Sequence, residues 1–237
     1  MKNTIPYLAG IISLFSITSC SDPVIDVGLP ENIISSTVRT ETLHNIEVMI
    51  PESKSLKDSM PALFEISTEK RILLSKASEV YVTFVSEGAS YQNSFGYYTY
   101  SADAVPTNTA LLNLQILFPN VDGSILKQGD MVQVGTTTFP VGTVIGFFVI
   151  VNGWQGESVH LDREKLYTDM NLNPDGDQQH VLFKLKNFGD IILGFEDISV
   201  SAPGHISSDY NDIIFTVTDN KVGNEVTNFN LNNVIRL

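Results

Sequence analysis

The sequence predicts an all-β protein that folds as an antiparallel β-sandwich of a jelly-roll-like kind. Short runs of β-branched and aromatic residues alternate with polar ones along much of the chain, and turn residues separate the runs. No segment longer than about a dozen residues keeps a helical period of apolar residues. No glycine fingerprint follows a strand to open a helix, so a nucleotide-binding α/β fold has no support. This combination is typical of a sandwich.

The first residues predict export with a lipid anchor. Lys2 supplies positive charge, residues 5–17 are mostly apolar, and small residues then precede Cys20. This is the layout of a lipoprotein signal peptide, here residues 1–19. The apolar stretch is too short for a comfortable membrane span. Cys20 is the only cysteine, so it can form no internal disulfide, and we expect its lipidation to provide the membrane attachment.

The residues after the cysteine predict an outer-membrane location. An aspartate directly after the lipidated cysteine would favour inner-membrane retention in a Gram-negative cell, and this chain has Ser21 there. The pair Ser21-Asp22 is a reduced form of the short acidic signals that carry some lipoproteins to the cell surface. Both faces of the outer membrane therefore stay open.

The composition excludes nucleic acid as a partner. Lys and Arg total 14 against 27 Asp and Glu, which gives a formal charge of −13. No basic cluster interrupts this acidic balance, so the chain repels phosphate backbones. A hydrophobic content of 43% is that of a globular protein rather than a disordered one.

Three regions are expected after the signal peptide. Residues 20–35 contain prolines and a glycine that interrupt any period, which predicts a flexible tether. Residues 36–78 form an N-terminal extension with mixed signals: residues 45–50 alternate and end at a proline, as a strand does, and residues 53–76 could include a short helix. Residues 79–237 form the sandwich domain. Its expected strands cover residues 80–85, 95–100, 112–118, 132–134, 143–151, 181–185, 191–195 and 212–218.

Two acidic clusters lie at the ends of two of these expected strands. Glu196 and Asp197 close one strand, and Asp209, Asn211 and Asp212 open the next. Carboxylates about 4 Å apart repel by about 1 kcal/mol per pair in water and by several kcal/mol at a protein-like dielectric. A cation removes that cost, and calcium accepts about six to eight oxygen ligands in irregular geometry. The sequence therefore predicts a Ca²⁺ site built from these five residues, backbone carbonyls and water.

Strand geometry ranks the five ligands. Neighbouring residues of a strand point to opposite faces, so Asp209 and Asn211 share a side while Asp212 faces away. The expected order is Asp197, Asp209 and Asn211 first, followed by Glu196 and Asp212. The alternative interpretation is that these residues are solvated loop acids or turn formers.

A second acidic loop covers residues 171–177. Its oxygen-bearing side chains alternate before a glycine, but its Asn-Pro and Asp-Gly pairs are also ordinary turn dipeptides. Three readings stay open: an ion of its own, a plain turn, or a loop that leans over the first site and lends it Asp169 or Asp175.

Several of these segments together resemble the LruC-domain family of bacterial envelope proteins. The resemblance covers residues 79–220 in order and implies a β-sandwich on an exported or surface-anchored protein, with an acidic pattern that looks like a calcium site. It implies no enzymatic activity, because the family consists largely of domains of unknown function. The matching segments are EVYVTFVSEGA (79–89), NSFGYYTY (93–100), LFPN (117–120), FPVGTVIGFFVIVNGW (139–154), LNPDG (172–176), QHV (179–181), GFED (194–197) and DYNDIIF (209–215).

The histidines do not predict a zinc site, and the aromatic residues suggest a possible sugar-binding surface. The four histidines are scattered without metal-ligand spacing, and His180, which precedes a strand, is expected to serve packing or a hydrogen bond. Trp154 and the tyrosines of residues 91–100 motivate the hypothesis of a platform that stacks on sugar rings. Such aromatic residues are more often core or cross-strand pairs.

The expected function is that of a non-enzymatic, calcium-stabilised envelope lipoprotein that binds a glycan, a matrix component or an envelope protein. One alternative is an adhesin or an appendage assembly component. The other is a hydrolase acting on polysaccharide, since paired catalytic carboxylates leave no spacing signature. A serine hydrolase is not supported, because the chain has no G-x-S-x-G elbow.

Overall fold

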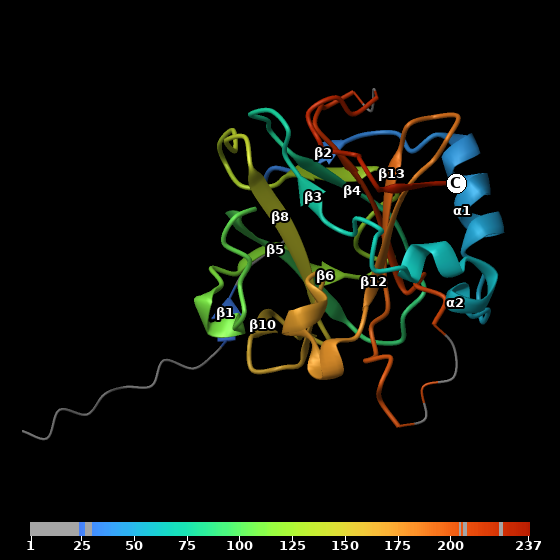
Figure 1. Ribbon diagram of the computed structural model, residues 1–237. Helices are drawn as coiled ribbons and strands as arrows, with labels where there is room; N and C mark the ends of the chain where they lie inside the picture. The colour runs from blue at the N-terminus through green and yellow to red at the C-terminus, as the bar shows by residue number, and fades with distance from the viewer. Residues whose placement is uncertain (1–23, 27–29, 204, 206–207, 223–224) are drawn as a thin grey trace, which may run out of the picture.

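Two large β-sheets pack face to face and confirm the predicted all-β sandwich (Figure 1). The computed structural model describes residues 24–26, 30–203, 205, 208–222 and 225–237. Strands account for 34% of the chain and helices for 13%, so the helices decorate a β framework.

The larger sheet has seven strands, and all its pairings are antiparallel except that of β15 with β12. In spatial order its strands are β15 (Ile235–Arg236), β12 (His180–Lys184), β13 (Ile191–Phe195), β14 (Ile213–Thr218), β4 (Tyr81–Glu87), β7 (Asp130–Gln133) and β2 (Ile34–Ser35).

The facing sheet has five strands, of which four lie side by side and the fifth pairs with one of these four. They are β11 (Lys165–Tyr167), β8 (Thr143–Ile150), β5 (Asn93–Ser101) and β6 (Gln115–Val121), with β3 (Ile72–Leu73) as the fifth. The strand predicted at residues 112–118 is shifted, because β6 begins at Gln115 and runs on to Val121. A small third sheet contains β1 (Val24–Asp26), β10 (Ser158–His160) and β9 (Trp154–Gln155).

Phenylalanine rings fill the space between the two large sheets. The ring of Phe95 on β5 stacks at 4.1 Å on that of Phe215 on β14, and at 5.5 Å on that of Phe147 on β8. Alternate residues such as Leu193 and Phe215 face this core while Ile192 and Ile214 face the opposite side. The period-two patterns read from the sequence therefore match the two faces of the sheet.

Helices cover much of the outer face of the seven-stranded sheet. They are α1 (Thr40–Met49), α2 (Leu56–Ser59) and the 3-10 turn η1 (Pro61–Phe64), and they bury Ile192 and Ile214. The strand predicted at residues 45–50 is therefore wrong, since most of that segment belongs to α1. Ile46 and Ile50 are four residues apart and both face the sheet, which is a helical spacing. Three further 3-10 turns are η2 (Thr109–Leu111), η3 (Met170–Leu172) and η4 (Pro174–Gly176).

The outer face of the five-stranded sheet holds three aromatic residues of the sugar-platform hypothesis, Tyr98, Tyr100 and Trp154. Tyr98 is fully buried there with Phe148 and Tyr167, and Trp154 packs half-buried against the same cluster. Their packing is that of a core layer, so the structure presents no open platform at Tyr98. His180 is buried, and its Nε2 lies 2.8 Å from the carbonyl oxygen of Lys70, which confirms its predicted hydrogen-bonding role.

The structure tests only part of the N-terminal predictions. The signal peptide of residues 1–19 and the lipidation site Cys20 lie outside the described residues. The flexible tether predicted for residues 20–35 contains β1 and β2, which pair with β10 and β7. Within the described part of the chain, no helix is long and apolar enough to cross a membrane.

Candidate functional site: an acidic pocket

Three strand ends meet at one edge of the seven-stranded sheet. β14 is antiparallel to both β13 and β4, so it begins where they end: Phe195 pairs with Ile213, and Ile213 pairs with Glu87. The acidic clusters that follow β13 and precede β14 are brought together for this reason. A pocket of about 500 Å³, here called the acidic pocket, opens at this edge. It is lined by Glu52, residues 88–91, residues 196–198, His205, Asp209 and Asp212.

A glycine lets the two acidic segments approach each other. A Cβ atom on Gly194 would lie 2.3 Å from the carbonyl oxygen of Tyr210, so no larger residue fits there without moving the backbone. Tyr210 has a φ of 56°, in the left-handed region, and its hydroxyl donates a 3.0 Å hydrogen bond to the carbonyl of Gln178. These contacts hold the second acidic segment against the end of β13.

The first cluster is buried and oriented by amide groups. Glu196 is 2% exposed and Asp197 is 4% exposed. One carboxylate oxygen of Glu196 accepts a 2.6 Å hydrogen bond from the backbone N–H of Tyr210. One oxygen of Asp197 accepts a 3.0 Å hydrogen bond from the side-chain amide of Asn93. Each carboxylate therefore has a fixed orientation, with its second oxygen left for a neighbouring group or an ion.

The second cluster follows the same arrangement. Asp209 is 4% exposed, and its Oδ2 accepts a 2.6 Å hydrogen bond from the backbone N–H of Ser53, just after α1. Asp212 Oδ2 accepts a 2.9 Å hydrogen bond from the backbone N–H of Asp197. Carboxylates that ligate metals are commonly held by such hydrogen bonds from outside the coordination shell.

The crowding of acids raises their proton affinity. Burial, with the neighbouring charges of Asp212, Asp209 and Asp197, raises the pKa of Glu196 to about 8. Burial and the charge of Asp197 raise the pKa of Asp212 to about 7. The pKa of Asp197 is also raised, again by burial. At neutral pH the pocket therefore holds either protons or another source of positive charge.

Asn211 does not join the other four predicted ligands. Its side-chain amide donates a 3.1 Å hydrogen bond to the carbonyl of Ile50, at the C-terminal end of α1. The prediction ranked Asn211 above Glu196 and Asp212, whereas the structure places the latter two in the pocket. Extended geometry does not apply to this segment, because Tyr210 turns the chain between Asp209 and Asn211.

The second acidic loop is a hydrogen-bonded turn away from the acidic pocket. Asn173 bonds through its side chain to the backbone N–H and C=O of Tyr167 and to the carbonyl of Asp177. Asp169 accepts hydrogen bonds of 2.7 Å and 2.6 Å from the hydroxyls of Tyr98 and Tyr100. It lines another pocket, so it does not contribute to the acidic one. The side chain of Asp175 lies outside those that the structure describes.

The pocket also contains residues that the sequence pattern did not predict for the site, among them one acidic, one aromatic and one imidazole side chain. Glu52 arrives from the end of α1, Tyr91 from the loop after β4, and His205 from the segment between the two clusters. His205 Nε2 lies 3.5 Å from Glu196 Oε2, so the two form an ion pair when the imidazole is protonated and the carboxylate is ionised. No local pattern marks Glu52 or Tyr91, because only the tertiary fold brings them to this edge.

The donor set fits a hard divalent cation, although the side chains are not yet arranged around one. Five carboxylates line the same pocket, those of Glu52 and of four predicted ligands, and oxygen ligands are what calcium prefers. Within the described part of the chain, however, no group of three or more His, Cys, Asp or Glu side chains is positioned to hold a metal ion as it stands. An ion here would require the second oxygens to turn inward.

Comparison with known proteins matches part of the chain to a domain family whose function is unknown. Residues 139–220 match the family model described as "Domain of unknown function (DUF4114)". The match begins just before β8, ends just after β14 and includes both acidic clusters. No curated protein and no solved structure matches the chain. Both acidic clusters of the pocket thus lie within the matched residues.

Proposed function

We propose that this chain is a non-enzymatic binding module of the cell envelope, stiffened by Ca²⁺ in the acidic pocket. The lipid on Cys20 and the outer-membrane location belong to this proposal and rest on the first 22 residues of the sequence. The finer assignment to an LruC-like domain rests on the motifs of residues 79–220. The observation that carries the ion is the convergence of Glu196, Asp197, Asp209 and Asp212 on one pocket.

The physical argument concerns charge. Four carboxylates, three of them buried and that of Asp212 half-buried, share the pocket with a single histidine. Their mutual repulsion destabilises the folded chain unless positive charge enters the pocket. Protons fill this role at low pH. Above neutral pH a cation is the better partner, because the carboxylates are then ionised and available as ligands. The carbonyls of the surrounding loops and water complete a shell of the irregular kind that calcium accepts.

The ion would join segments that are far apart in sequence. Glu52 follows α1, residues 88–91 follow β4, and the two acidic clusters flank β13 and β14. An ion that binds only the folded state stabilises it by RT ln(1 + [L]/Kd), which is about 3–4 kcal/mol at a hundredfold to thousandfold excess over Kd. The expected physical role of calcium is therefore rigidity.

Thermal unfolding of the chelated protein with and without added metal tests this proposal. We expect Ca²⁺ to raise Tm by several degrees and Mg²⁺ to raise it less, since Mg²⁺ requires stricter octahedral geometry. Asp209→Asn keeps the hydrogen bond from Ser53 but removes a charged ligand, so it should weaken the calcium effect. Asp103→Asn, at an exposed carboxylate between β5 and β6, is the matched control. If Ca²⁺ leaves the Tm of the wild type unchanged, the proposal of a bound ion is refuted. If Ca²⁺ raises the Tm of Asp209→Asn as much as that of the wild type, the ion does not bind in this pocket.

An adhesin or assembly component is the second candidate. Three exposed apolar side chains surround a pocket of about 390 Å³: Ile66 is fully exposed, Val105 is 43% exposed and Met170 is 37% exposed. Exposed apolar groups that cluster in this way favour a protein partner. Sedimentation velocity of the wild type and of Ile66→Asp tests whether this rim holds a second copy of the chain.

A polysaccharide hydrolase is the third candidate, and Glu196 is the residue that favours it. A carboxyl whose pKa lies at about 8 is protonated at neutral pH and can serve as a general acid. Turnover that persists in chelator and disappears in Glu196→Gln would displace the non-enzymatic proposal. A stable Glu196→Gln variant that alters only the calcium response would support the structural role.

A further inference from the structure

A buried asparagine links the acidic pocket to the facing sheet. Asn93 is the first residue of β5, and its side chain is fully buried. Its Nδ2 donates the 3.0 Å hydrogen bond to Asp197 Oδ2, and its Oδ1 accepts a 2.9 Å hydrogen bond from the backbone N–H of Asn152. One amide therefore connects a predicted ion ligand, which follows β13, with the turn that follows β8.

The two hydrogen bonds fix the orientation of this amide. The backbone N–H of Asn152 can only donate, so it faces the oxygen of the Asn93 amide, and the NH₂ group is then directed at Asp197. The reverse orientation would set an oxygen against a carboxylate and an NH₂ group against an N–H group, and both bonds would be lost. Asn93 thus occupies Oδ2 of Asp197 and leaves Oδ1 for a neighbouring group or an ion. A residue of the opposite sheet therefore sets the position of this carboxylate.

The turn after β8 has little room to adjust. Asn152 has a φ of 48°, in the left-handed region that asparagine tolerates better than most residues. A Cβ atom on Gly153 would lie 2.8 Å from the Oγ of Ser94 and 2.8 Å from the Cβ of Ile150, so no larger residue fits there without a shift. A displacement of the Asn93 side chain is therefore transmitted to this turn rather than absorbed by free space around it.

We propose that Asn93 is a positioning residue that couples ion binding in the acidic pocket to the turn of residues 152–154. The inference rests on the proposed calcium site. Without an ion, repulsion among the carboxylates displaces Asp197 and loosens its bond to Asn93. An ion holds Asp197 in place, so Asn93 keeps both hydrogen bonds and the turn becomes more rigid. Because coupling between two sites is reciprocal, a rigid turn also strengthens ion binding.

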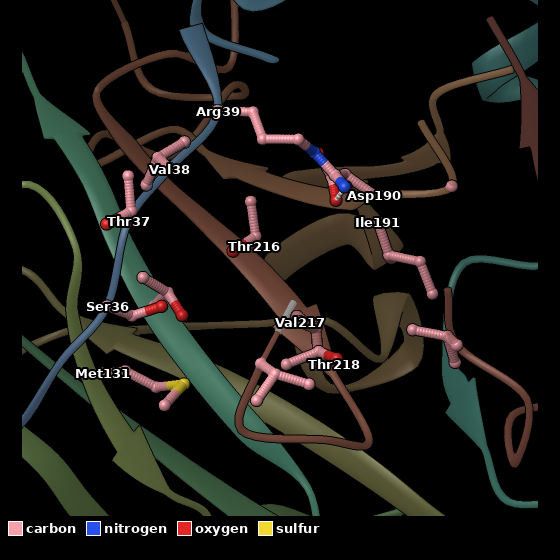
Figure 2. A pocket seen from close by; sticks show the side chains of 14 residues that line it. Ser36, Thr37, Val38, Arg39, Met131, Asp190, Ile191, Thr216, Val217 and Thr218 are labelled. Atoms are coloured by element: carbon pink, nitrogen blue, oxygen red, sulfur yellow. Dashed lines mark hydrogen bonds and ion pairs between the residues drawn. The ribbon is translucent and has the colours of Figure 1, made fainter. Parts of the chain in front are cut away.

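The opposite end of the seven-stranded sheet provides a control. A pocket of about 270 Å³ lies there, at the other end of β14 from the acidic pocket (Figure 2). Figure 2 shows Arg39 reaching Asp190, and Arg39 Nε lies 3.3 Å from Asp190 Oδ2. The hydroxyl of Thr42 donates to the same carboxylate. The substitution Asp190→Asn weakens these contacts, so it lowers stability without touching the acidic pocket or its link to the turn.

Amide hydrogen exchange, measured by NMR in chelator and in saturating calcium, tests the coupling. We expect calcium to slow the exchange of the Asn152 amide by a factor at least about fivefold larger than that for the Phe139 amide. The Phe139 amide is hydrogen-bonded to the carbonyl of Ser78 and precedes β8, at the other end of this strand from Asn152. It therefore reports the global stabilisation that calcium gives to the whole fold.

Two variants separate the coupling from a loss of stability. Asn93→Ala should abolish the difference between the two amides. It should also weaken calcium binding about tenfold in calorimetric titration, because Asp197 loses the group that orients it. Asp190→Asn should lower Tm but keep both the exchange response and the calcium affinity.

The outcomes distinguish the coupling from the calcium site itself. If the wild type binds no calcium, the proposed calcium site is refuted and the coupling with it. If the wild type binds calcium while the Asn152 and Phe139 amides respond equally, the coupling is refuted and the calcium site stands. A folded Asn93→Ala variant that keeps the wild-type affinity and the difference between the amides also refutes the coupling. If Asn93→Ala does not fold, the comparison of the two amides in the wild type decides alone.

Discussion

The chelated protein should lose stability as pH rises from acid to slightly alkaline conditions. The pKa of Glu196 is raised from 4.5 to about 8 in the folded chain. A carboxyl with a raised folded-state pKa binds more protons in the folded than in the unfolded state between those two values. Its contribution to stability is complete below pH 4.5 and is lost as pH rises through 8. Asp212, raised from 3.8 to about 7, acts in the same direction.

The magnitude follows from the proton affinity. Each tenfold change in affinity corresponds to about 1.4 kcal/mol, so the rise for Glu196 amounts to about 5 kcal/mol at most. The contributions of Glu196 and Asp212 do not add, because each includes repulsion from the same neighbours. A loss of about 3–5 kcal/mol between pH 5 and pH 8 is expected, and Tm should fall by about 2–4 °C for each kcal/mol.

Urea unfolding at pH 5, 6, 7 and 8, in chelator and in millimolar calcium, measures this effect. Calcium should restore most of the loss at pH 8 and little at pH 5, where protons compete for the same oxygens. Glu196→Gln should flatten the profile in chelator, because its amide does not titrate and still accepts the hydrogen bond from Tyr210. A chelated wild type that is as stable at pH 8 as at pH 5 would refute the electrostatic reasoning. A loss of stability at pH 8 that calcium does not reverse would agree with the electrostatic reasoning but refute the proposed calcium site.

Three further predictions concern the fold. In urea unfolding, Ile46→Ala should destabilise the protein by about 2–4 kcal/mol and Val48→Ala by less than about 0.5 kcal/mol. The reason is that α1 buries Ile46 and leaves Val48 63% exposed. Equal losses of stability would fit a strand instead. Gly194→Ala should lower Tm and weaken calcium binding together, because the new Cβ meets the Tyr210 carbonyl at 2.3 Å; a variant with unchanged Tm would show that this approach is not tight. Asp190→Ala should cost about 1–2 kcal/mol by removing the acceptor for Arg39 and Thr42, and a matched Asp103→Ala should cost almost nothing in the same measurement.

The strands could be predicted because their patterns are local. Residues 191–195 and 213–218 alternate between two buried faces, and the structure places β13 and β14 there. Helix α1 could not be separated from a strand by the same means. Ile46 and Ile50 lie on one face under either period, and only the exposure of Val48 distinguishes them. That exposure depends on which surface the segment packs against, which is tertiary information.

The acidic pocket was partly foreseeable for a related reason. Glu196, Asp197, Asp209 and Asp212 flank adjacent antiparallel strands, so strand pairing alone brings them to one edge. The prediction for Asn211 differs from the structure because its side-chain amide donates a hydrogen bond to the carbonyl of Ile50. No residue near Asn211 in the sequence indicates that the end of a helix packs there.

Trp154 gives the protein a built-in optical reporter. It is the only tryptophan in the chain, and its indole is half-buried against the outer aromatic layer of the five-stranded sheet. Its backbone N–H donates a 2.9 Å hydrogen bond to the carbonyl of Gln92, the residue after Tyr91 in the loop that borders the acidic pocket. The intrinsic fluorescence of Trp154 should therefore respond to changes in this loop. A change in emission on metal addition would report such a change without any introduced label.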